Sequence, residues 1–249
     1  MKFRIIPTIL TDGTTVVKGK NFNNWRTVGS AVAMARLFAS RDVDELIFLD
    51  VTARHRKKTI DIDLITKFSN LLSTPFTVGG GIDSVSQAAS CLRSGAEKVI
   101  LGSTAYENPK LVGEIADKFG NQAVVVAVDL LSCNSNHFSI HSGSTTISEN
   151  FLEYIQKLER LGAGEIMLQC KALDGEMKGL CLEQLKSAVG VVKCPIVVSS
   201  GAASPSDYLN AYKIGAAGVA AGAIFQFTQL TPKEIRESLR SQGVPVRNS

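Results

Sequence analysis

The chain has 249 residues and a formal net charge of +4 at pH 7, with 45% hydrophobic and 20% charged residues. This ordinary globular composition excludes a disordered, collagen-like or low-complexity chain, and the mild charge offers no nucleic-acid footprint. No apolar run approaches the roughly 20 residues of a membrane span, and the N-terminus lacks a signal-peptide pattern. We therefore expect a cytoplasmic protein with no membrane or nucleic-acid partner.

Short apolar runs alternate with helical patterns along the whole chain. Strands are predicted at residues 3–10, 45–51, 76–78, 98–101, 123–129, 165–170, 196–199 and 218–221. Helices are predicted at residues 28–39, 60–72, 84–94, 109–119, 147–161, 182–189, 205–214 and 232–241. Four residues lie where helix N-caps belong: Ser84, Asn108, Ser204 and Thr231. The alternation predicts a single α/β domain over residues 1–249, a (β/α)8 (TIM) barrel, with an open doubly wound sheet as the rival.

The two halves of the chain resemble each other at one constant offset. Residues 44–47 parallel 164–167, residues 75–78 parallel 195–198, and residues 95–96 parallel 215–216, each pair 120 positions apart. Three landmarks at a single offset favour the barrel over the open sheet. They also predict that the barrel is built from two similar half-barrels.

Glycine-rich turns follow four of the predicted strands, at the end where a barrel places its active site. Gly80 and Gly81 follow the third strand and Ser103 the fourth. Gly201 follows the seventh strand and Gly222 the eighth. Because bare glycines let backbone N–H groups approach an anion, the turns predict one phosphate cradle per half and a phosphorylated small molecule as ligand. The alternative is that these glycines only form tight turns.

Asp129 ends the fifth predicted strand, where its carboxylate can face the barrel mouth. Two carboxylates at such a place would divide general-acid from general-base duties. The repeat puts Ile9, next to Leu10, at the position that matches Asp129, and the nearest acid is Asp12. The sequence thus predicts one member of a catalytic pair. The alternative is that Asp129 caps a loop.

Four charged residues lie at the opposite end of the predicted strands. Arg4, Glu45, Lys98 and Glu165 each stand at or near the start of a strand. Side chains at strand starts can converge at the bottom of a barrel, where partly desolvated charges need one another. Two cations and two anions balance there. The alternative is a set of solvated surface charges.

The remaining reactive residues predict neither a metal site nor a cofactor. The five cysteines form no CxxC pair and no metal-ligand spacing, so in a cytosolic chain they are expected to be reduced core thiols. The three histidines have no second ligand motif beside them. The basic cluster of Arg54, Arg56, Lys57 and Lys58 is interpreted as a loop tip, with contact to an anionic ligand as the alternative.

The motifs of the chain resemble those of the HisF family, the cyclase subunits of imidazole glycerol phosphate synthase, over nearly its whole length. The matching runs are RIIP at 4–7, VVKG at 16–19, NF at 21–22, DELIFLD at 44–50, TVGGGI at 77–82, AVVVAVD at 123–129, GAGEI at 162–166 and FQF at 225–227. The resemblance implies a glutaminase subunit at the barrel bottom and ammonia that passes through the barrel to a cyclase site at its top. Arg4, Glu45, Lys98 and Glu165 fall on the family's ammonia gate, and all four residue types match.

The top of the barrel departs from the family's pattern. The family's cyclase uses two aspartates, of which the second matches Asp129 and the first is replaced by Leu10. Lys18, Asp50 and Asp174 match other positions on the active-site face. The remaining changes remove hydroxyl and amide donors from both phosphate cradles, at residues 102–103, 169–170, 172–175, 200–202 and 222–223.

A paralogue group shows the same replacement. The chain looks like the WbuZ-type proteins of surface-polysaccharide (O-antigen) gene clusters, in which leucine also replaces the first aspartate and a run similar to residues 25–30 occurs. This resemblance implies that the barrel and its glutaminase supply ammonia to a separate ATP-dependent sugar amidotransferase, with the barrel's own cyclase site impaired. The alternative is an authentic cyclase, a lyase of histidine biosynthesis.

Overall fold

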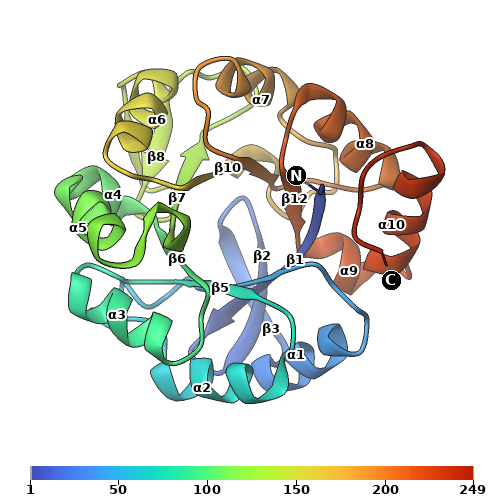
Figure 1. Ribbon diagram of the computed structural model, residues 1–249, viewed down its shortest axis with the longest axis horizontal. Coiled ribbons are helices and arrows are strands. Elements are labelled where there is room, and N and C mark those ends of the chain that lie inside the picture. The colour runs from blue at the N-terminus through green and yellow to red at the C-terminus, as the bar shows by residue number, and fades with distance from the viewer. Residues whose placement is uncertain (1, 249) are drawn as a thin grey trace.

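Eight parallel strands close into a barrel in the computed structural model, which describes residues 2–248. The barrel strands are β1 (Arg4–Asp12), β4 (Leu46–Asp50), β5 (Phe76–Gly79), β6 (Lys98–Leu101), β7 (Val124–Leu130), β10 (Glu165–Cys170), β11 (Ile196–Ser199) and β12 (Gly218–Ala221). β12 pairs with β1, so the ring has no free edge, and Figure 1 shows the helices around it. The predicted (β/α)8 barrel is confirmed. Met1 and Ser249, the limits of the predicted domain, lie outside the described residues.

Long helices cover the outside of this ring. They are α1 (Ala31–Ala39), α2 (Ile62–Leu71), α3 (Val85–Arg93), α5 (Lys110–Phe119), α6 (Phe151–Arg160), α7 (Leu182–Val189), α8 (Pro205–Ile214) and α10 (Pro232–Ser241). Ser84, Ser204 and Thr231 are N-caps as predicted. The prediction for Asn108 is wrong, because a short helix, α4 (Ser103–Glu107), ends there and Pro109 precedes α5. Within residues 2–248 no helix has the length and apolar character that a membrane crossing requires.

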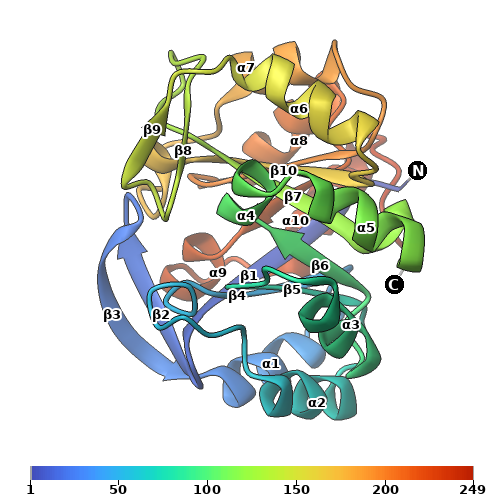
Figure 2. The same ribbon diagram turned by 90° about the vertical axis from the view of Figure 1, so that its left-hand side faces the viewer.

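Two antiparallel hairpins extend the barrel beyond the predicted elements. They are β2 (Thr15–Lys20) with β3 (Asn23–Ser30), which continue β1, and β8 (Phe138–Ile140) with β9 (Thr145–Ile147), which continue β7. The predicted helix at 28–39 begins only at Ala31, because Gly29 and Ser30 pair with β2. Figure 2 shows both hairpins at the end of the barrel remote from the chain termini. We call this end the top and the other the bottom.

The repeat in the sequence is also a repeat in the structure. β1 and β7 begin 120 residues apart, as do β5 and β11, β6 and β12, and α3 and α8. The short helices α4 and α9 (Ala223–Phe227) share this offset, and the two hairpins occupy equivalent places. The predicted half-barrels are therefore confirmed. Two short 3-10 turns complete the described elements, η1 (Asn121–Ala123) and η2 (Lys171–Leu173).

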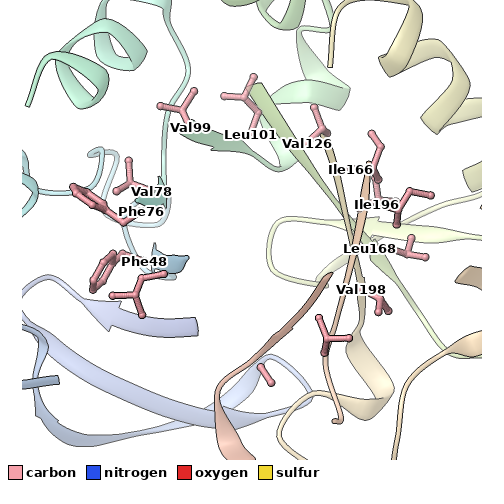
Figure 3. Close-up of a cluster of buried hydrophobic side chains, with 14 of the residues drawn as sticks. Phe48, Phe76, Val78, Val99, Leu101, Val126, Ile166, Leu168, Ile196 and Val198 are labelled. Atoms are coloured by element: carbon pink, nitrogen blue, oxygen red, sulfur yellow. The ribbon is translucent and has the colours of Figure 1, made fainter. Parts of the chain in front are cut away.

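The larger hydrophobic core lies between the barrel and its helices. Figure 3 shows strand side chains of this core, among them Phe48 and Phe76. Phe48 stacks on Phe68 of α2 with ring centroids 3.8 Å apart, and full burial of such a side chain contributes about 1.5–3 kcal/mol. Alternate strand residues face the barrel axis instead. They form a second apolar layer inside the barrel, of Ile6, Ile47, Ile100, Val125, Met167, Val197 and Ala220.

Candidate functional site

Four charged side chains form a closed ring at the bottom of the barrel. Arg4, at the start of β1, donates hydrogen bonds to Glu45 and Glu165 at 2.7 Å each. The Lys98 ammonium lies 3.1 Å from Glu45 and 3.4 Å from Glu165. Each cation therefore contacts both carboxylates, and the charges alternate around the ring. These are not solvated surface charges, because the side chains of Glu45 and Glu165 are 5% and 10% exposed.

The ring favours the charged forms of Glu45 and Arg4 against the effect of burial. Burial acts to raise the pKa of Glu45, but the charges of Lys98 and Arg4 and a 2.7 Å hydrogen bond from Thr77 bring it below its usual value. Burial likewise acts to lower the pKa of Arg4, and the carboxylates of Glu165 and Glu45 outweigh it and raise that pKa. Loss of one member would leave each of its two neighbours buried with one partner instead of two.

Between this ring and the top of the barrel, the axis is lined by aliphatic side chains. Ile6, Ile47, Ile100, Val125 and Met167 form most of this layer, and each is at most 4% exposed. Transfer of an ion into such surroundings costs far more than transfer of a small neutral molecule. The layer therefore discriminates between neutral and charged forms of any solute that crosses it.

A cavity of about 120 Å³ opens at the top of the barrel, mainly over the second half-barrel. It brings together residues from distant parts of the chain that the sequence predicts on the active-site face: Leu10, Lys18, Asp129, Asp174, Gly201 and Gly222. Strand ends supply Leu10 and Asp129, and the β2–β3 hairpin supplies Lys18. Predicted residues from both halves of the chain, Leu10 and Lys18 from the first and the other four from the second, thus converge on one cavity.

Asp129 is the acidic group at the strand end of this cavity. Its Oδ1 accepts a 2.8 Å hydrogen bond from Gln169 Nε2, and within residues 2–248 its carboxylate caps no loop. Burial raises the pKa of Asp129 to about 7, against the opposing effect of Gln169. A carboxyl group with such a pKa can give or accept a proton at neutral pH. Leu10 lines the same cavity from β1 and supplies no second carboxylate there.

Lys18 presents a buried amino group to the cavity. Burial lowers the pKa of Lys18 to about 8, and the Asp174 carboxylate opposes this. Burial raises the pKa of Asp174, although the charge of Lys18 and a hydrogen bond from the backbone N–H of Phe22 act to lower it. Gly222 leaves room for the lysine, since a Cβ added there would lie 2.0 Å from Lys18 Nζ. At neutral pH the cavity therefore holds a mostly protonated lysine.

The glycine turns of the second half border the cavity. Gly201 has a φ of 89°, and an added Cβ would lie 2.1 Å from the carbonyl oxygen of Gly179, so this position requires glycine. Ser200 and Thr8 also line the cavity, and their hydroxyl oxygens are buried with no hydrogen-bond partner among the described residues. Buried polar groups are ordinarily hydrogen-bonded, so these two hydroxyls are exceptions beside the cavity.

The glycine turns of the first half also pack against their own chain, but they do not border this cavity. A Cβ added at Gly80 would lie 2.5 Å from a backbone oxygen of β4. A Cβ added at Gly81 would lie 1.9 Å from the carbonyl oxygen of a loop residue. The Oγ of Ser103 accepts a 2.8 Å hydrogen bond from the backbone N–H of His141. Gly80, Gly81 and Ser103 do not line the cavity, and Gly81 borders a separate open hollow of about 510 Å³. The two predicted cradles are therefore not equivalent.

Asp50, predicted on the active-site face, holds a neighbouring loop and does not line the cavity. Its carboxylate accepts hydrogen bonds from Arg56 at 2.6 Å and from the backbone and hydroxyl of Thr52 at 3.0 Å. Arg54 forms an ion pair with Glu107 of α4. The basic cluster is a loop as predicted, and its arginines bind the chain's own carboxylates. Its two lysines border the hollow described above.

A disulfide joins two loops at the top of the barrel. Cys133, after β7, is bonded to Cys181, which precedes α7, and Cys170 Sγ lies 3.9 Å from Cys133 Sγ. Cys91, Cys170 and Cys194 are free. The prediction that all five thiols are reduced is wrong for the bonded pair. The two residues are 48 positions apart, and they meet because β7 and β10 are neighbours in the barrel.

Two aromatic residues of the cavity were missed by sequence reasoning. Phe22 and Trp25 line the cavity from the β2–β3 hairpin. The signal available was the cluster of asparagines at 21, 23 and 24, since asparagine favours tight turns and tolerates positive φ. Asn21 and Asn24 indeed have φ values of 54° and 55°.

Comparison with known proteins gives matches along almost the entire chain. A family model described as "Histidine biosynthesis protein" matches residues 4–231. The imidazole glycerol phosphate synthase subunit HisF of Thermococcus onnurineus is 38% identical over 246 residues, covering 98% of this chain and 97% of the relative. The same subunit of Pyrococcus furiosus is 36% identical over 246 residues, covering 98% of each chain. That of Thermobifida fusca is 36% identical over 251 residues, again covering 98% of each.

Proposed function

Because the chain belongs to the histidine biosynthesis protein family and is homologous to HisF subunits, we propose that it pairs with a glutaminase and conducts ammonia. The observation that carries this proposal is the closed ring of Arg4, Glu45, Lys98 and Glu165. A glutaminase seated on the barrel bottom would release ammonia directly beneath the ring. The paired charges would keep bulk water out of the barrel axis, because each is already bound to its neighbours.

The weaker side of the ring is the side that can open. Both Lys98 contacts are longer than those of Arg4, and a lysine has a flexible stem. Displacement of Lys98 would admit a small solute to the aliphatic layer above, which favours neutral ammonia over ammonium. Barrel interiors are packed rather than open, so passage takes place as side chains of this layer move.

The top of the barrel supports a proposal for the destination of the ammonia. The β1 member of the predicted catalytic pair is missing, because Leu10 stands where the family resemblance predicts aspartate. The other carboxylate of the cavity, Asp174, comes from the loop after β10 and faces Lys18. Loss of a general acid or base costs roughly 10²–10⁴ in rate. We therefore assign the ammonia to a separate acceptor enzyme, an ATP-dependent sugar amidotransferase, and the WbuZ-type resemblance supports this choice.

A second candidate is the activity named in the relatives, with this chain as a cyclase subunit of imidazole glycerol phosphate synthase. The observation that favours it is the cavity itself. Asp129, Lys18 and Asp174 still meet there beside the glycine turns of the second half. A single acid–base group with a pKa of about 7 could support slow cyclisation.

Association with a glutaminase tests the shared part of both candidates. The purified chain should bind a glutaminase of the same organism at micromolar concentration and raise its rate of glutamine hydrolysis. A Lys58→Ala variant, changed on an exposed loop at the top, is the matched control and should bind equally well. No association at micromolar concentration would contradict any role in ammonia transfer.

Cyclase turnover separates the two candidates. With ammonium salts and the phosphoribulosyl substrate of the relatives, the chain alone should show little or no turnover if it is a conduit. Robust turnover, or growth rescue of a bacterial strain that lacks its cyclase, would favour the second candidate.

A further inference from the structure

Three cysteines meet beside the cavity although they are far apart in the sequence. Cys133 lies in the loop after β7, Cys170 ends β10 and Cys181 precedes α7. Their three sulfur atoms all lie within 4.8 Å of one another. Within residues 2–248 no second group of three His, Cys, Asp or Glu ligand atoms is suited to a metal ion.

The sulfur positions match the spacing of a metal–thiolate site. Zinc binds thiolate sulfur at about 2.3 Å in tetrahedral geometry, which places two ligand sulfurs about 3.8 Å apart. Cys133 Sγ and Cys170 Sγ are already separated by 3.9 Å. Once the bond between Cys133 and Cys181 is broken, rotation of these side chains can bring the third sulfur to the same spacing.

We propose that the reduced chain holds a zinc ion on the thiolates of Cys133, Cys170 and Cys181. The disulfide is then the oxidised, metal-free form of the same site. Thiolates select zinc and softer ions, and three protein ligands leave a fourth position for water. A dithiol reductant supplies two electrons, so that the S–S bond breaks, two thiols form and the reductant becomes a disulfide. Zinc then displaces the thiol protons.

The three cysteines differ in their access to solvent. Cys170 and Cys181 are buried, whereas Cys133 is partly exposed and gives the ion a path from solvent.

Zinc at this place would fasten the loops that form the cavity. Cys133 follows the strand that carries Asp129, and Cys170 follows Gln169, the partner of Asp129. Residues 171–181 include Asp174, which lines the cavity. The inference does not depend on the proposed function, and its test needs neither a glutaminase nor a substrate.

Metal titration of the reduced protein tests the site. The full chain is reduced with a phosphine, which becomes a phosphine oxide, and titrated with Co²⁺ as a spectroscopic probe and then with Zn²⁺. We expect one Co²⁺ per chain with sulfur-to-cobalt charge-transfer absorption, and its displacement by one Zn²⁺. The oxidised chain, which contains the disulfide, should bind neither Co²⁺ nor Zn²⁺ at this site.

Cysteine variants identify the ligands. Cys170→Ser is decisive because it leaves the bond between Cys133 and Cys181 intact, so that its fold can be checked by circular dichroism. It should weaken binding by more than the roughly 10–100-fold that loss of an outer-shell contact costs. Cys91→Ser and Cys194→Ser, which change the two cysteines outside the cluster, should bind as the parent does. Absence of stoichiometric binding by the reduced chain, or full binding by Cys170→Ser, would overturn the proposal.

Discussion

The two ends of the barrel interior handle buried charge in opposite ways. At the bottom, each of the four charges contacts two of opposite sign, and the pKa of Glu45 is held below its usual value. At the top, the Asp129 carboxyl faces an amide, and burial raises its pKa to about 7. The bottom therefore needs all its members, whereas at the top the Asp129 carboxyl group can be neutralised by a proton and needs no cation beside it.

The two halves of the top differ in a similar way. The repeat supplies equivalent strands and equivalent short helices, α4 and α9. In the second half the turns at Gly201 and Gly222 line the cavity with Asp129 and Lys18, whereas in the first half Gly81 borders a separate open hollow. The backbone frame is thus shared, and the loops around it divide the two halves between different hollows.

The largest effect on stability is expected from Lys98→Ala. The variant leaves Glu45 and Glu165 with one cation instead of two, and breaking a buried pair typically costs about 3–5 kcal/mol. Urea unfolding should show a loss of this size in the free energy of unfolding. The exposed control Lys58→Ala should stay within about 0.5 kcal/mol of the parent. Equal free energies of unfolding for Lys98→Ala and the control would mean that the ring does not stabilise the folded chain.

Asp129→Asn should change the pH dependence of stability. The pKa of Asp129 rises from 3.8 to about 7 on folding, so the native state binds more protons between these values. This contribution lowers the free energy of unfolding as pH rises through that window. Asn cannot titrate, so the free energy of unfolding of the variant should rise relative to that of the parent between pH 4 and 8. Because one pKa unit corresponds to about 1.4 kcal/mol, this rise should be a few kcal/mol at most. A difference that does not vary with pH would contradict the raised pKa.

Leu10→Asp should restore no more than a trace of cyclase turnover. The substitution returns a second carboxylate to the cavity but leaves the first-half turns closed against their own chain. The increase in the cyclase rate should thus be smaller than the roughly 10²–10⁴-fold that an acid–base group typically contributes. Leu49→Asp, which adds a carboxylate to the same cavity from β4, is the matched control. Equal turnover by both variants would show that position 10 has no special role.

The smallest effect is expected from Gly222→Ala. Its Cβ would meet the flexible end of Lys18, which can move, so the free energy of unfolding should fall by about 1 kcal/mol or less. Gly201→Ala should cost more, because its obstacle is the backbone of Gly179 and its φ is positive. Thermal unfolding compares the two variants. A larger loss for Gly222→Ala would mean that Lys18 is fixed in place.

Sequence patterns predicted the barrel well where strands are buried on both sides. β6, β10, β11 and β12 have the predicted bounds, because buried parallel strands read as short apolar runs. The exposed strand β3 carries no such signal, so part of it was predicted as helix. Contacts between loops could not be predicted from the sequence either. The bond of Cys133 to Cys181 and the closure around Gly81 join segments whose approach depends on the complete fold.

If this barrel passes ammonia on without using it for cyclisation, glutamine hydrolysis and cyclisation should be uncoupled. This is measured as the amount of imidazole glycerol phosphate formed per glutamate released, with the glutaminase partner, glutamine and the phosphoribulosyl substrate present. We expect faster glutamate release than from the glutaminase alone, with almost no imidazole glycerol phosphate. Equal amounts of the two products would contradict this expectation.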